Sequence, residues 1–342
     1  MQRRQFSLFA ATTALGLVLA GCASSSTTTS QSPGAPSSKT ADAATSSPAV
    51  SASTDATSTA PAAAKGEVKI GAANFSESAL LAQMYSLLLA KAGYTPKLQT
   101  VDNRELYEPA LEQGQIDVVP DYLATMAEFL NKKVNGAKAD TAPIATGDAT
   151  ATATALRTIA TPLGLTVLEP SNAVDANAFA VTKAFAAAHN LKTLSDLGKS
   201  GIAVKLAATA ECPTRTFCQK ALTDKYGIKI AKSDPLGFGS TQTKQAVKSG
   251  KDDLGLVGST DGTLESFGLV ILEDDKHIQL ADNLVAIVGK KFSADKDLAA
   301  ALNALNAALT TADLAALEGK VDGERMKAED VAKDYLKSKG LL

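Results

Sequence analysis

The chain has 342 residues, of which 45% are hydrophobic and 20% charged, and this length and composition predict about two domains with packed cores. Its formal net charge of −2 argues against a nucleic-acid partner, which would need a basic face, and there is no apolar run long enough for a lasting transmembrane helix. Trp is absent and His189 and His277 are the only histidines, so we expect no histidine-based catalysis, no metal site and no cofactor.

The first 21 residues are typical of a secretory signal peptide, because Arg3 and Arg4 precede a short apolar stretch from Phe6 to Ala20. The following Leu19-Ala20-Gly21-Cys22 resembles a bacterial lipobox, in which the cysteine is lipidated after residues 1–21 are removed. An ordinary signal peptide with a chance cysteine is the alternative. The paired arginines also resemble a twin-arginine signal, so the export route stays open.

Residues 22–66 are predicted to be the lipidated cysteine and a disordered linker. Only five of the 42 residues between 23 and 64 are not Ala, Ser, Thr, Pro or Gly, and none is aromatic. Such a segment cannot bury enough apolar surface to offset its chain entropy. We therefore expect an exported globular body that is lipid-anchored to the outer face of the cell membrane.

Strands and helices alternate from residue 67 onward, in two successive sets. The first set has expected strands at 68–72, 97–101, 116–119 and 165–168 and helices at 76–92, 105–113, 122–130 and 150–161. The second has strands at 202–205, 228–231, 254–257, 270–272 and 284–288, helices at 218–225 and 241–249, and a helical tail at 296–309, 311–318 and 328–339. This alternation predicts an α/β fold with a mainly parallel sheet and flanking helices in each set.

One arrangement occurs twice and predicts two similar lobes. A helix, a glycine and a strand precede Asp121, and the same order precedes Asp261. Because ligands bind beyond the carboxyl ends of parallel strands, loops of both lobes should line one cleft. The candidate ligand-binding residues in these loops are Asn74, Phe75, Ser76, Asp121, Tyr122, Ser240, Thr241, Thr260 and Asp261. For each of them, a helix cap or a turn residue is the alternative.

The residue types in these loops favour binding over catalysis, since neither a nucleophile elbow nor a phosphate-binding loop occurs. Aromatic faces can hold a quaternary ammonium group, and Tyr122 directly follows a strand. Further aromatic candidates, each of which could instead be core, are Phe75, Tyr107, Phe179 and Phe238. Arg215 could bind a ligand carboxylate, and the alternative is that it is a charged residue on the surface. Its neighbours Cys212 and Cys218 suit a disulfide in an exported protein, with two free thiols as the alternative.

Several motifs carry a family resemblance: Gly71–Glu77, Ala110–Asp117, Val119–Thr125, Glu211–Cys218 and Leu272–His277. From residue 68 to 342 the chain resembles the substrate-binding proteins of osmoprotectant ABC transporters, the glycine betaine/choline/carnitine family of ProX and OpuAC type. The resemblance implies a two-lobe periplasmic-binding-protein fold of type II, with hinge crossovers near 178–182 and 284–288. Lobe 1 would comprise 67–180 and 285–342, and lobe 2 would comprise 181–284.

The resemblance also implies a function and partners. A monomeric receptor would trap a small quaternary ammonium solute between its lobes and deliver it to an ABC permease and its ATPase. Tyr122 matches one wall of the family's aromatic box, Thr125 lies in the same motif, and Phe179 stands in for a second aromatic wall. Relatives often have Lys where this chain has Ala73. We expect a binding protein and not an enzyme; the alternatives are another small polar solute, a sensor, or an exported enzyme using Asp117, Asp121 or Asp261 as base.

Overall fold

The computed structural model describes residues 65–342, which lie within one compact unit. The predicted signal peptide, Cys22 and the linker up to residue 64 lie outside the described residues. The predicted linker reached residue 66, but Lys65 already contacts the folded body. Its backbone N–H donates to Gly93 O (3.0 Å), and its ammonium group pairs with Asp297 (2.6 Å).

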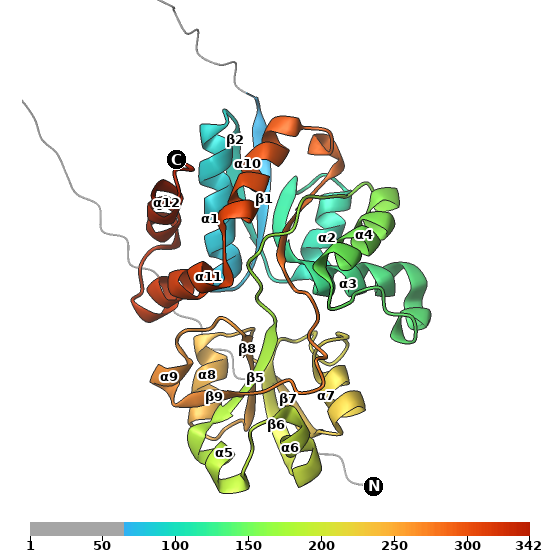
Figure 1. The fold of residues 1–342 in the computed structure, drawn as a ribbon, viewed down its shortest axis with the longest axis vertical. Coiled ribbons are helices and arrows are strands. Elements are labelled where there is room, and N and C mark those ends of the chain that lie inside the picture. Colours follow the sequence, from blue (N-terminus) through green and yellow to red (C-terminus); the bar gives the residue numbers. More distant parts are fainter. Residues whose placement is uncertain (1–64) are drawn as a thin grey trace, which may run out of the picture. The chain divides into compact units, whose positions relative to one another are not determined.

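Lobe 1 is built on a five-stranded sheet with the order β2-β1-β3-β10-β4 (Figure 1). Its strands are β1 (Glu67–Ala73), β2 (Thr95–Val101), β3 (Val118–Tyr122), β4 (Thr166–Val167) and β10 (Leu284–Val288). β1 is parallel to β2 and β3, whereas β10 runs antiparallel to both β3 and β4. Four of the five strands therefore share one direction, and β10 is the reversed one.

Lobe 2 repeats this plan with the order β7-β6-β8-β5-β9. Its strands are β5 (Asn177–Thr182), β6 (Ala203–Ala208), β7 (Lys229–Pro235), β8 (Leu254–Gly258) and β9 (Leu269–Leu272). β6 is parallel to β7 and β8, and β5 is antiparallel to β8 and β9. The reversed strand is again the fourth in the order, so the predicted pair of similar lobes is confirmed. Each sheet is therefore mixed. Its reversed strand is the first strand that the chain forms after crossing over from the other lobe.

The crossovers lie slightly away from the predicted positions. Two chain segments pass between the lobes, one after β4 and one before β10 (Figure 1). Phe179 pairs with Leu256 and Leu272 in the second sheet, so β5 belongs to lobe 2 and the boundary predicted after residue 180 moves to before Asn177. At the other crossover, β10 pairs with β3 and β4 in the first sheet.

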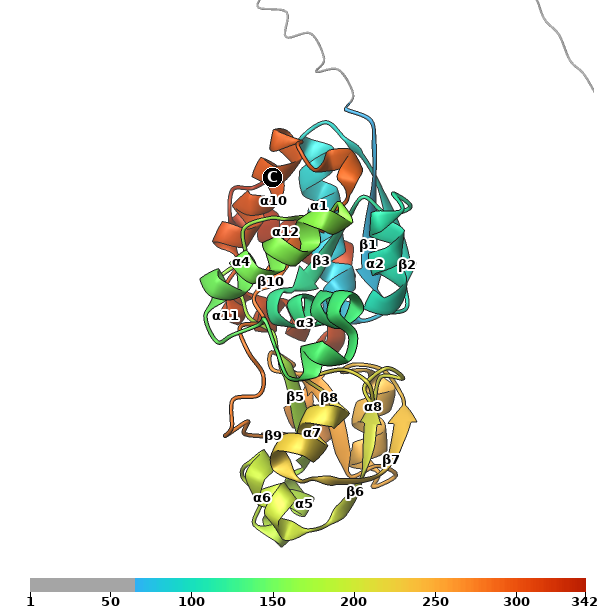
Figure 2. The same ribbon diagram turned by 90° about the vertical axis from the view of Figure 1, so that its right-hand side faces the viewer.

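Helices cover both faces of each sheet, as Figure 2 shows from a second side. In lobe 1 they are α1 (Ser76–Lys91), α2 (Arg104–Glu112), α3 (Leu123–Asn135), α4 (Ala149–Ala160), α10 (Lys296–Ala308), α11 (Thr311–Glu318) and α12 (Ala328–Ser338). In lobe 2 they are α5 (Lys183–His189), α6 (Leu194–Ser200), α7 (Gln219–Tyr226), α8 (Thr241–Lys248) and α9 (Leu264–Phe267). Of these, α6 and the short α9 were not predicted.

Alternate residues of β10 pack into two different cores, because successive side chains of a strand point to opposite faces. Leu284, Ala286 and Val288 pack with α1, α10, α11 and α12. Val285 and Ile287 pack with α2, α3 and α4. A strand buried on both faces reads as a continuous apolar run, which is why the segment 284–288 could be recognised from the sequence.

A hydrogen-bonded aspartate marks the same place in both lobes. Asp117 accepts from Lys69 N (2.8 Å) and donates from its own N–H to Lys69 O (2.8 Å). Asp253 makes the same two contacts with Lys205, each at 2.9 Å. Each aspartate thus joins the turn before one strand to the neighbouring parallel strand, and Asp117 is committed to this role.

The start of α1 differs from expectation. A helix cap was the alternative role for Asn74 and Ser76, but the capping position is held by Phe75, and no side chain caps the helix start. Ser78 instead accepts a hydrogen bond from Ala73 N (2.8 Å) and holds the β1–α1 turn. This turn directs Phe75 toward the loops that follow the other strands. Within residues 65–342, no helix combines the length and apolarity needed to cross a membrane.

Candidate functional site

A cavity of about 650 Å³ is lined by loops of both lobes, a size typical of small-molecule sites. Lobe 1 contributes the β1–α1 turn, the start of α2, and residues of β3 and α3. Lobe 2 contributes the segment 209–217 and the loop around Phe238. The crossovers supply Asp175 and Asp282. The predicted shared cleft is therefore present, with both connecting segments at its wall.

Three aromatic side chains form one wall of this cavity. The ring centroids of Phe75 and Tyr122 lie 6.3 Å apart in a stacked arrangement, and those of Phe75 and Phe238 lie 5.1 Å apart edge to face. Phe75 and Tyr122 come from lobe 1 and Phe238 from lobe 2, so the wall spans both lobes. The Tyr122 hydroxyl donates to Glu77, which fixes the ring against the cavity.

Arg104 forms a second, polar wall and is held by Asp121, in what we call the Arg104–Asp121 pair. Arg104 donates from Nε and Nη2 to the Asp121 carboxylate, and Nη2 also reaches Thr125 Oγ1 (2.9 Å). Asp121 accepts further from the Tyr107 hydroxyl (2.6 Å) and from Tyr122 N (2.7 Å). Burial disfavours the guanidinium charge, but the charge and hydrogen bonds of Asp121, together with the charges of Tyr107 and Asp282, outweigh it and raise the pKa of Arg104. Among the described residues, no hydrogen bond uses Arg104 Nη1, which leaves that group for the cavity.

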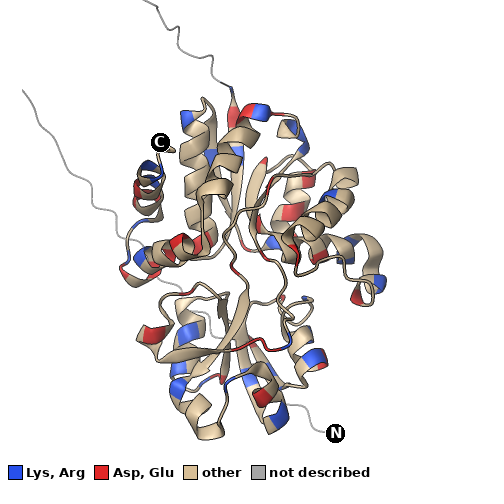
Figure 3. Ribbon diagram, in the orientation of Figure 1, with Lys and Arg blue, Asp and Glu red and all other residues tan. Residues whose placement is uncertain are grey.

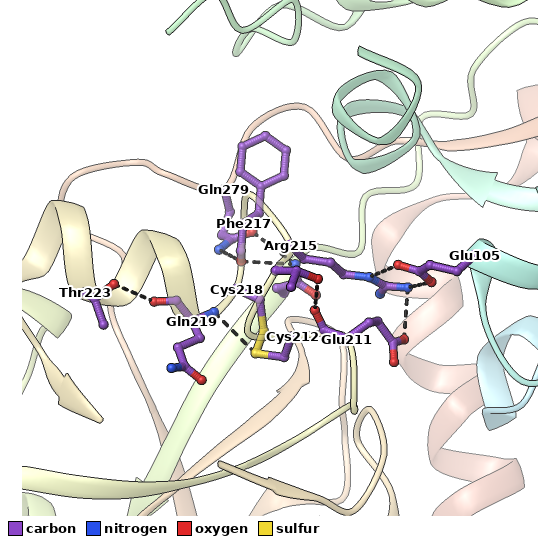
Figure 4. Close-up of a disulfide and its surroundings, with 11 residues drawn as sticks. Glu105, Glu211, Cys212, Arg215, Phe217, Cys218, Gln219, Thr223 and Gln279 are labelled. Atoms are coloured by element: carbon purple, nitrogen blue, oxygen red, sulfur yellow. Dashed lines mark hydrogen bonds and ion pairs between the residues drawn. A yellow bond between two sulfur atoms is a disulfide. The ribbon is translucent and has the colours of Figure 1, made fainter. Parts of the chain in front are cut away.

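Arg215 is already paired across the cavity (Figure 4). It donates from Nε to Glu105 Oε1 (3.1 Å) and from Nη2 to Glu105 Oε2 (2.8 Å), and it also contacts Glu211 (3.0 Å). Glu105 lies on α2 of lobe 1, so this contact joins the two lobes. Burial works against the charge of Glu105, but the hydrogen bonds and charge of Arg215, with smaller contributions from the backbone and Arg104, together outweigh it and lower the pKa of Glu105. Both partners are about one-third exposed, and such pairs contribute roughly 0–1 kcal/mol.

The loop that carries Arg215 is closed at its ends by Cys212 and Cys218, whose sulfur atoms lie 2.00 Å apart (Figure 4). Both cysteines are buried in the core of lobe 2. Phe217 in the same loop packs into a core of lobe 1, and its carbonyl accepts from Gln279 (3.0 Å). The closed loop thus presents Arg215 and Phe217 together to the opposite lobe.

Three buried carboxylates lie behind the aromatic wall, in what we call the acidic cluster: Glu77 on α1, Asp175 on the first crossover and Glu318 at the end of α11. One oxygen from each lies within 4.8 Å of the others. Burial, followed by the charge of Asp175, raises the pKa of Glu77. Burial likewise raises the pKa of Asp175 to about 6 and that of Glu318 to about 7. Within residues 65–342, none of the three pairs with a Lys or Arg.

Five of the predicted ligand-binding residues line the cavity, and these are Asn74, Phe75, Tyr122, Thr125 and Arg215. The others lie elsewhere for identifiable reasons. Asp121 is fully buried beneath Arg104, and Phe179 is in the core of lobe 2 because its strand is covered on both faces. Thr260 donates to Glu318 (3.2 Å) within the acidic cluster.

Three further predicted residues stabilise α8 and its surroundings instead of lining the cavity. Ser240 caps α8 by accepting from Thr243 N (3.0 Å), and Thr241 is the first residue of that helix. Asp261 pairs with the buried Lys244 (2.8 Å). Ser76 likewise begins α1 without reaching the cavity wall. For these four the helix-cap or turn alternative is the better description.

Sequence reasoning missed several lining residues, above all Arg104, Phe129, Asp175 and Asp282. Asp282 is fully buried, where its carboxylate accepts from Thr125 N (2.8 Å) and burial raises its pKa to about 7. A charged residue at a helix start or in a connecting segment normally faces solvent, so nothing in the local pattern singles these positions out. His277 is exposed and has a left-handed backbone conformation, away from this cavity.

Comparison with known proteins assigns the chain to a family. Residues 66–338 match the OpuAC family, described as the substrate binding domain of ABC-type glycine betaine transport systems. The chain belongs to this family. The predicted resemblance is therefore confirmed, and so is the expectation of a solute-binding protein and not an enzyme, because the family and its relatives are solute-binding proteins.

Relatives in the OpuAC family agree over most of the chain. A glycine-betaine-binding protein of Pseudomonas aeruginosa is 25% identical over 80% of this chain and 88% of its own length. The glycine betaine-binding protein YehZ of Escherichia coli is 26% identical over 82% and 93%. A crystal structure titled as a glycine betaine/carnitine/choline ABC transporter aligns with a TM-score of 0.57 at 23% identity, over 80% of this chain and 98% of that one. The last comparison confirms the two-lobe periplasmic-binding-protein fold.

Proposed function

We propose that this OpuAC-family protein captures a quaternary ammonium solute in the cavity between its lobes, with glycine betaine, proline betaine and carnitine preferred over choline. The observation that supports this proposal is that the cavity has an aromatic wall, formed by Phe75, Tyr122 and Phe238, and a separate cationic group, Arg104. Aromatic faces suit a methylated ammonium group, which can make no hydrogen bond of its own. A guanidinium suits a carboxylate.

Two further features support a zwitterionic solute over a plain cation. Arg104 is held rigidly by Asp121 and Thr125, so presenting Nη1 to a ligand costs little conformational entropy. Asp175 lines the cavity near the aromatic wall and adds negative charge on the ammonium side. Arg215, which sequence reasoning favoured for the carboxylate, is already bound by Glu105 and Glu211. Its role in this proposal is to join the lobes when they close on the solute.

Isothermal titration calorimetry with glycine betaine, proline betaine, carnitine, choline and ectoine tests the solute class. We expect the carboxylated quaternary ammonium compounds to bind one per chain, and choline to bind more weakly. Tyr122→Ala should weaken glycine betaine binding at least about tenfold, because it removes one aromatic face of the cavity wall. Absence of binding across the panel would reject the quaternary ammonium class.

Arg104→Lys separates the two ends of the solute. This substitution keeps the positive charge but loses Nη1, the guanidinium nitrogen left for the cavity while Nε and Nη2 are held by Asp121. Glycine betaine affinity should fall several-fold while choline affinity changes little, since choline has no carboxylate. An equal effect on both solutes would remove Arg104 from the site while leaving the aromatic wall standing.

The transport role extends this proposal to the whole chain. Solute binding would favour the closed arrangement of the lobes, and an ABC permease with its ATPase would bind that form of the monomeric receptor. Export, lipidation at Cys22 and a Cys212–Cys218 disulfide that stabilises the Arg215 loop belong to the same proposal. Radiolabelled fatty acid incorporation that is lost in Cys22→Ala tests the anchor, and thiol labelling with and without reductant tests the disulfide.

A further inference from the structure

The side chain of Phe217 reaches from lobe 2 into lobe 1. Phe217 is 8% exposed and belongs to the apolar cluster that α2, α3 and α4 form with one face of β10, which includes Leu123 and Ile287. All other buried members of this cluster come from lobe 1. Among the described residues, no other buried apolar side chain of lobe 2 joins a core of lobe 1. Phe217 therefore occupies an apolar socket that the opposite lobe provides.

The backbone of Phe217 is fixed to lobe 2, although its ring lies in lobe 1. The next residue, Cys218, is buried in the core of lobe 2. The Phe217 carbonyl accepts from Gln279 Nε2 (3.0 Å) and from Asn177 Nδ2 (3.4 Å). Asn177 is the first residue of β5, and Gln279 lies on the segment that leads to the second crossover. Figure 4 shows the ring directed away from the disulfide. The ring can therefore leave its socket only when the lobes move apart.

Burial makes the Phe217 contact a stronger link between the lobes than the ion pair in the same loop. Arg215 and Glu105 are about one-third exposed, so their pair favours the joined lobes by no more than about fivefold. Separating the lobes would also return a buried aromatic side chain to water. That exposure disfavours the separated arrangement by about ten- to hundredfold.

We propose that Phe217 is a knob that holds the two lobes together before and after solute binding, and that its ring must leave the socket before solute can enter or leave the cavity. Phe217 itself lines the cavity, and residues of both lobes enclose it, so separating the lobes exposes the cavity. The knob thus controls the rates of solute entry and release. This inference rests on the proposed solute site, but the arrangement of the lobes without solute tests the knob by itself.

Stopped-flow measurement of glycine betaine binding, followed by tyrosine fluorescence, tests the knob in the full chain. Phe217→Ala should raise both the association and the dissociation rate constants by about tenfold, because opening then exposes less apolar surface. Loss of a simple solute contact would raise the dissociation rate constant alone, and that result would overturn the proposal. Phe217→Leu keeps part of the apolar contact, so it guards against a folding defect of the alanine variant and should give a smaller increase in both rate constants.

Small-angle X-ray scattering of the full chain without solute tests the knob separately from the solute. Phe217→Ala should have a larger radius of gyration than the unsubstituted chain. Phe185→Ala is the matched control, because Phe185 packs against the core of its own lobe, and its radius of gyration and rate constants should not change.

Two scattering results would overturn the knob: an unchanged radius of gyration in Phe217→Ala, or an equal increase in Phe185→Ala. A larger radius of gyration in Phe217→Ala alone would support the knob even if no variant bound glycine betaine. The absence of binding would then reject the proposed solute and not the link between the lobes.

Discussion

Two groups of buried carboxylates border the cavity, and they differ in what balances their charge. Asp121 receives a guanidinium, a tyrosine hydroxyl and a backbone N–H, so each of its oxygens is satisfied by the protein itself. The acidic cluster has hydroxyl and backbone donors but no cation among the described residues. The first arrangement holds a charged side chain in place for the solute, whereas in the second burial raises the pKa of each carboxyl group and favours its protonated form.

The comparison also explains the distribution of charge in the rest of the protein. Figure 3 shows Lys and Arg interspersed with Asp and Glu on the helices of both lobes. Those exposed charges are screened by water and contribute little individually. The buried carboxylates beside the cavity are different, because each one must be compensated in a low-dielectric environment. The hydrogen-bond and ion-pair partners of each buried carboxylate therefore indicate its role beside the cavity.

The largest expected effect is the loss of the guanidinium in the Arg104–Asp121 pair. Arg104→Met leaves Asp121 buried without its counter-charge and should lower the free energy of unfolding by about 3–5 kcal/mol. Urea unfolding at pH 7.5 measures this. Arg215→Met is the matched control, because Arg215 makes an equally two-pronged contact but is about one-third exposed, and it should cost no more than about 1 kcal/mol. Equal losses in the two variants would contradict the distinction drawn from burial.

A second prediction concerns Asp282, whose pKa is influenced by Arg104, Asp121 and Asp175. Burial raises its pKa to about 7, so the folded state binds a proton that the unfolded state releases near pH 4. Stability from this group is present at low pH and is lost as the pH rises from about 4 to 7, by roughly 2–4 kcal/mol. The side chain in Asp282→Asn can still accept a hydrogen bond from Thr125 N. Because it does not titrate, this variant should not lose that stability as the pH rises.

Unfolding measurements between pH 4 and 8 test the Asp282 prediction through the difference between the two proteins. The Asn variant should become the more stable one, relative to the unsubstituted protein, as the pH increases. Other titrating groups are common to both and largely cancel in the difference. A difference in the free energy of unfolding that stays constant between pH 4 and 8 would mean that Asp282 stays ionised on folding. Asp282 would then belong with the buried carboxylates whose charge the protein itself compensates.

The smallest expected effect separates the two roles of Tyr122, whose ring lines the cavity and whose hydroxyl donates to Glu77. Tyr122→Phe keeps the ring, so glycine betaine affinity should stay within about threefold by calorimetry, in contrast to Tyr122→Ala. The same substitution removes the side-chain donor of Glu77 and should lower the free energy of unfolding by about 1–3 kcal/mol. A large loss of solute affinity would assign the hydroxyl, and not the ring, to the solute.

The fold could be predicted from local patterns because they report burial directly. The apolar run 284–288 is buried on both faces, and Gly93 ends α1 with a positive φ that suits glycine. The repeat around Asp117 and Asp253 reflects a contact made within each lobe. The position of β5 was harder, because Phe179 was expected to stand in for an aromatic wall of the cavity but pairs within the second sheet.

The amino-acid sequence alone determined the α/β class, the two similar lobes, the family and the aromatic residues Phe75 and Tyr122, since these follow from periodicity, strand ends and motifs along the chain. Only the tertiary structure decided which charges meet: Arg104 with Asp121, Arg215 with Glu105, and Glu77 with Asp175 and Glu318. The physical reason is that a charge has no periodic signature, and its energy depends on burial and on partners that are remote in sequence. The polar wall of the cavity depends on those partners.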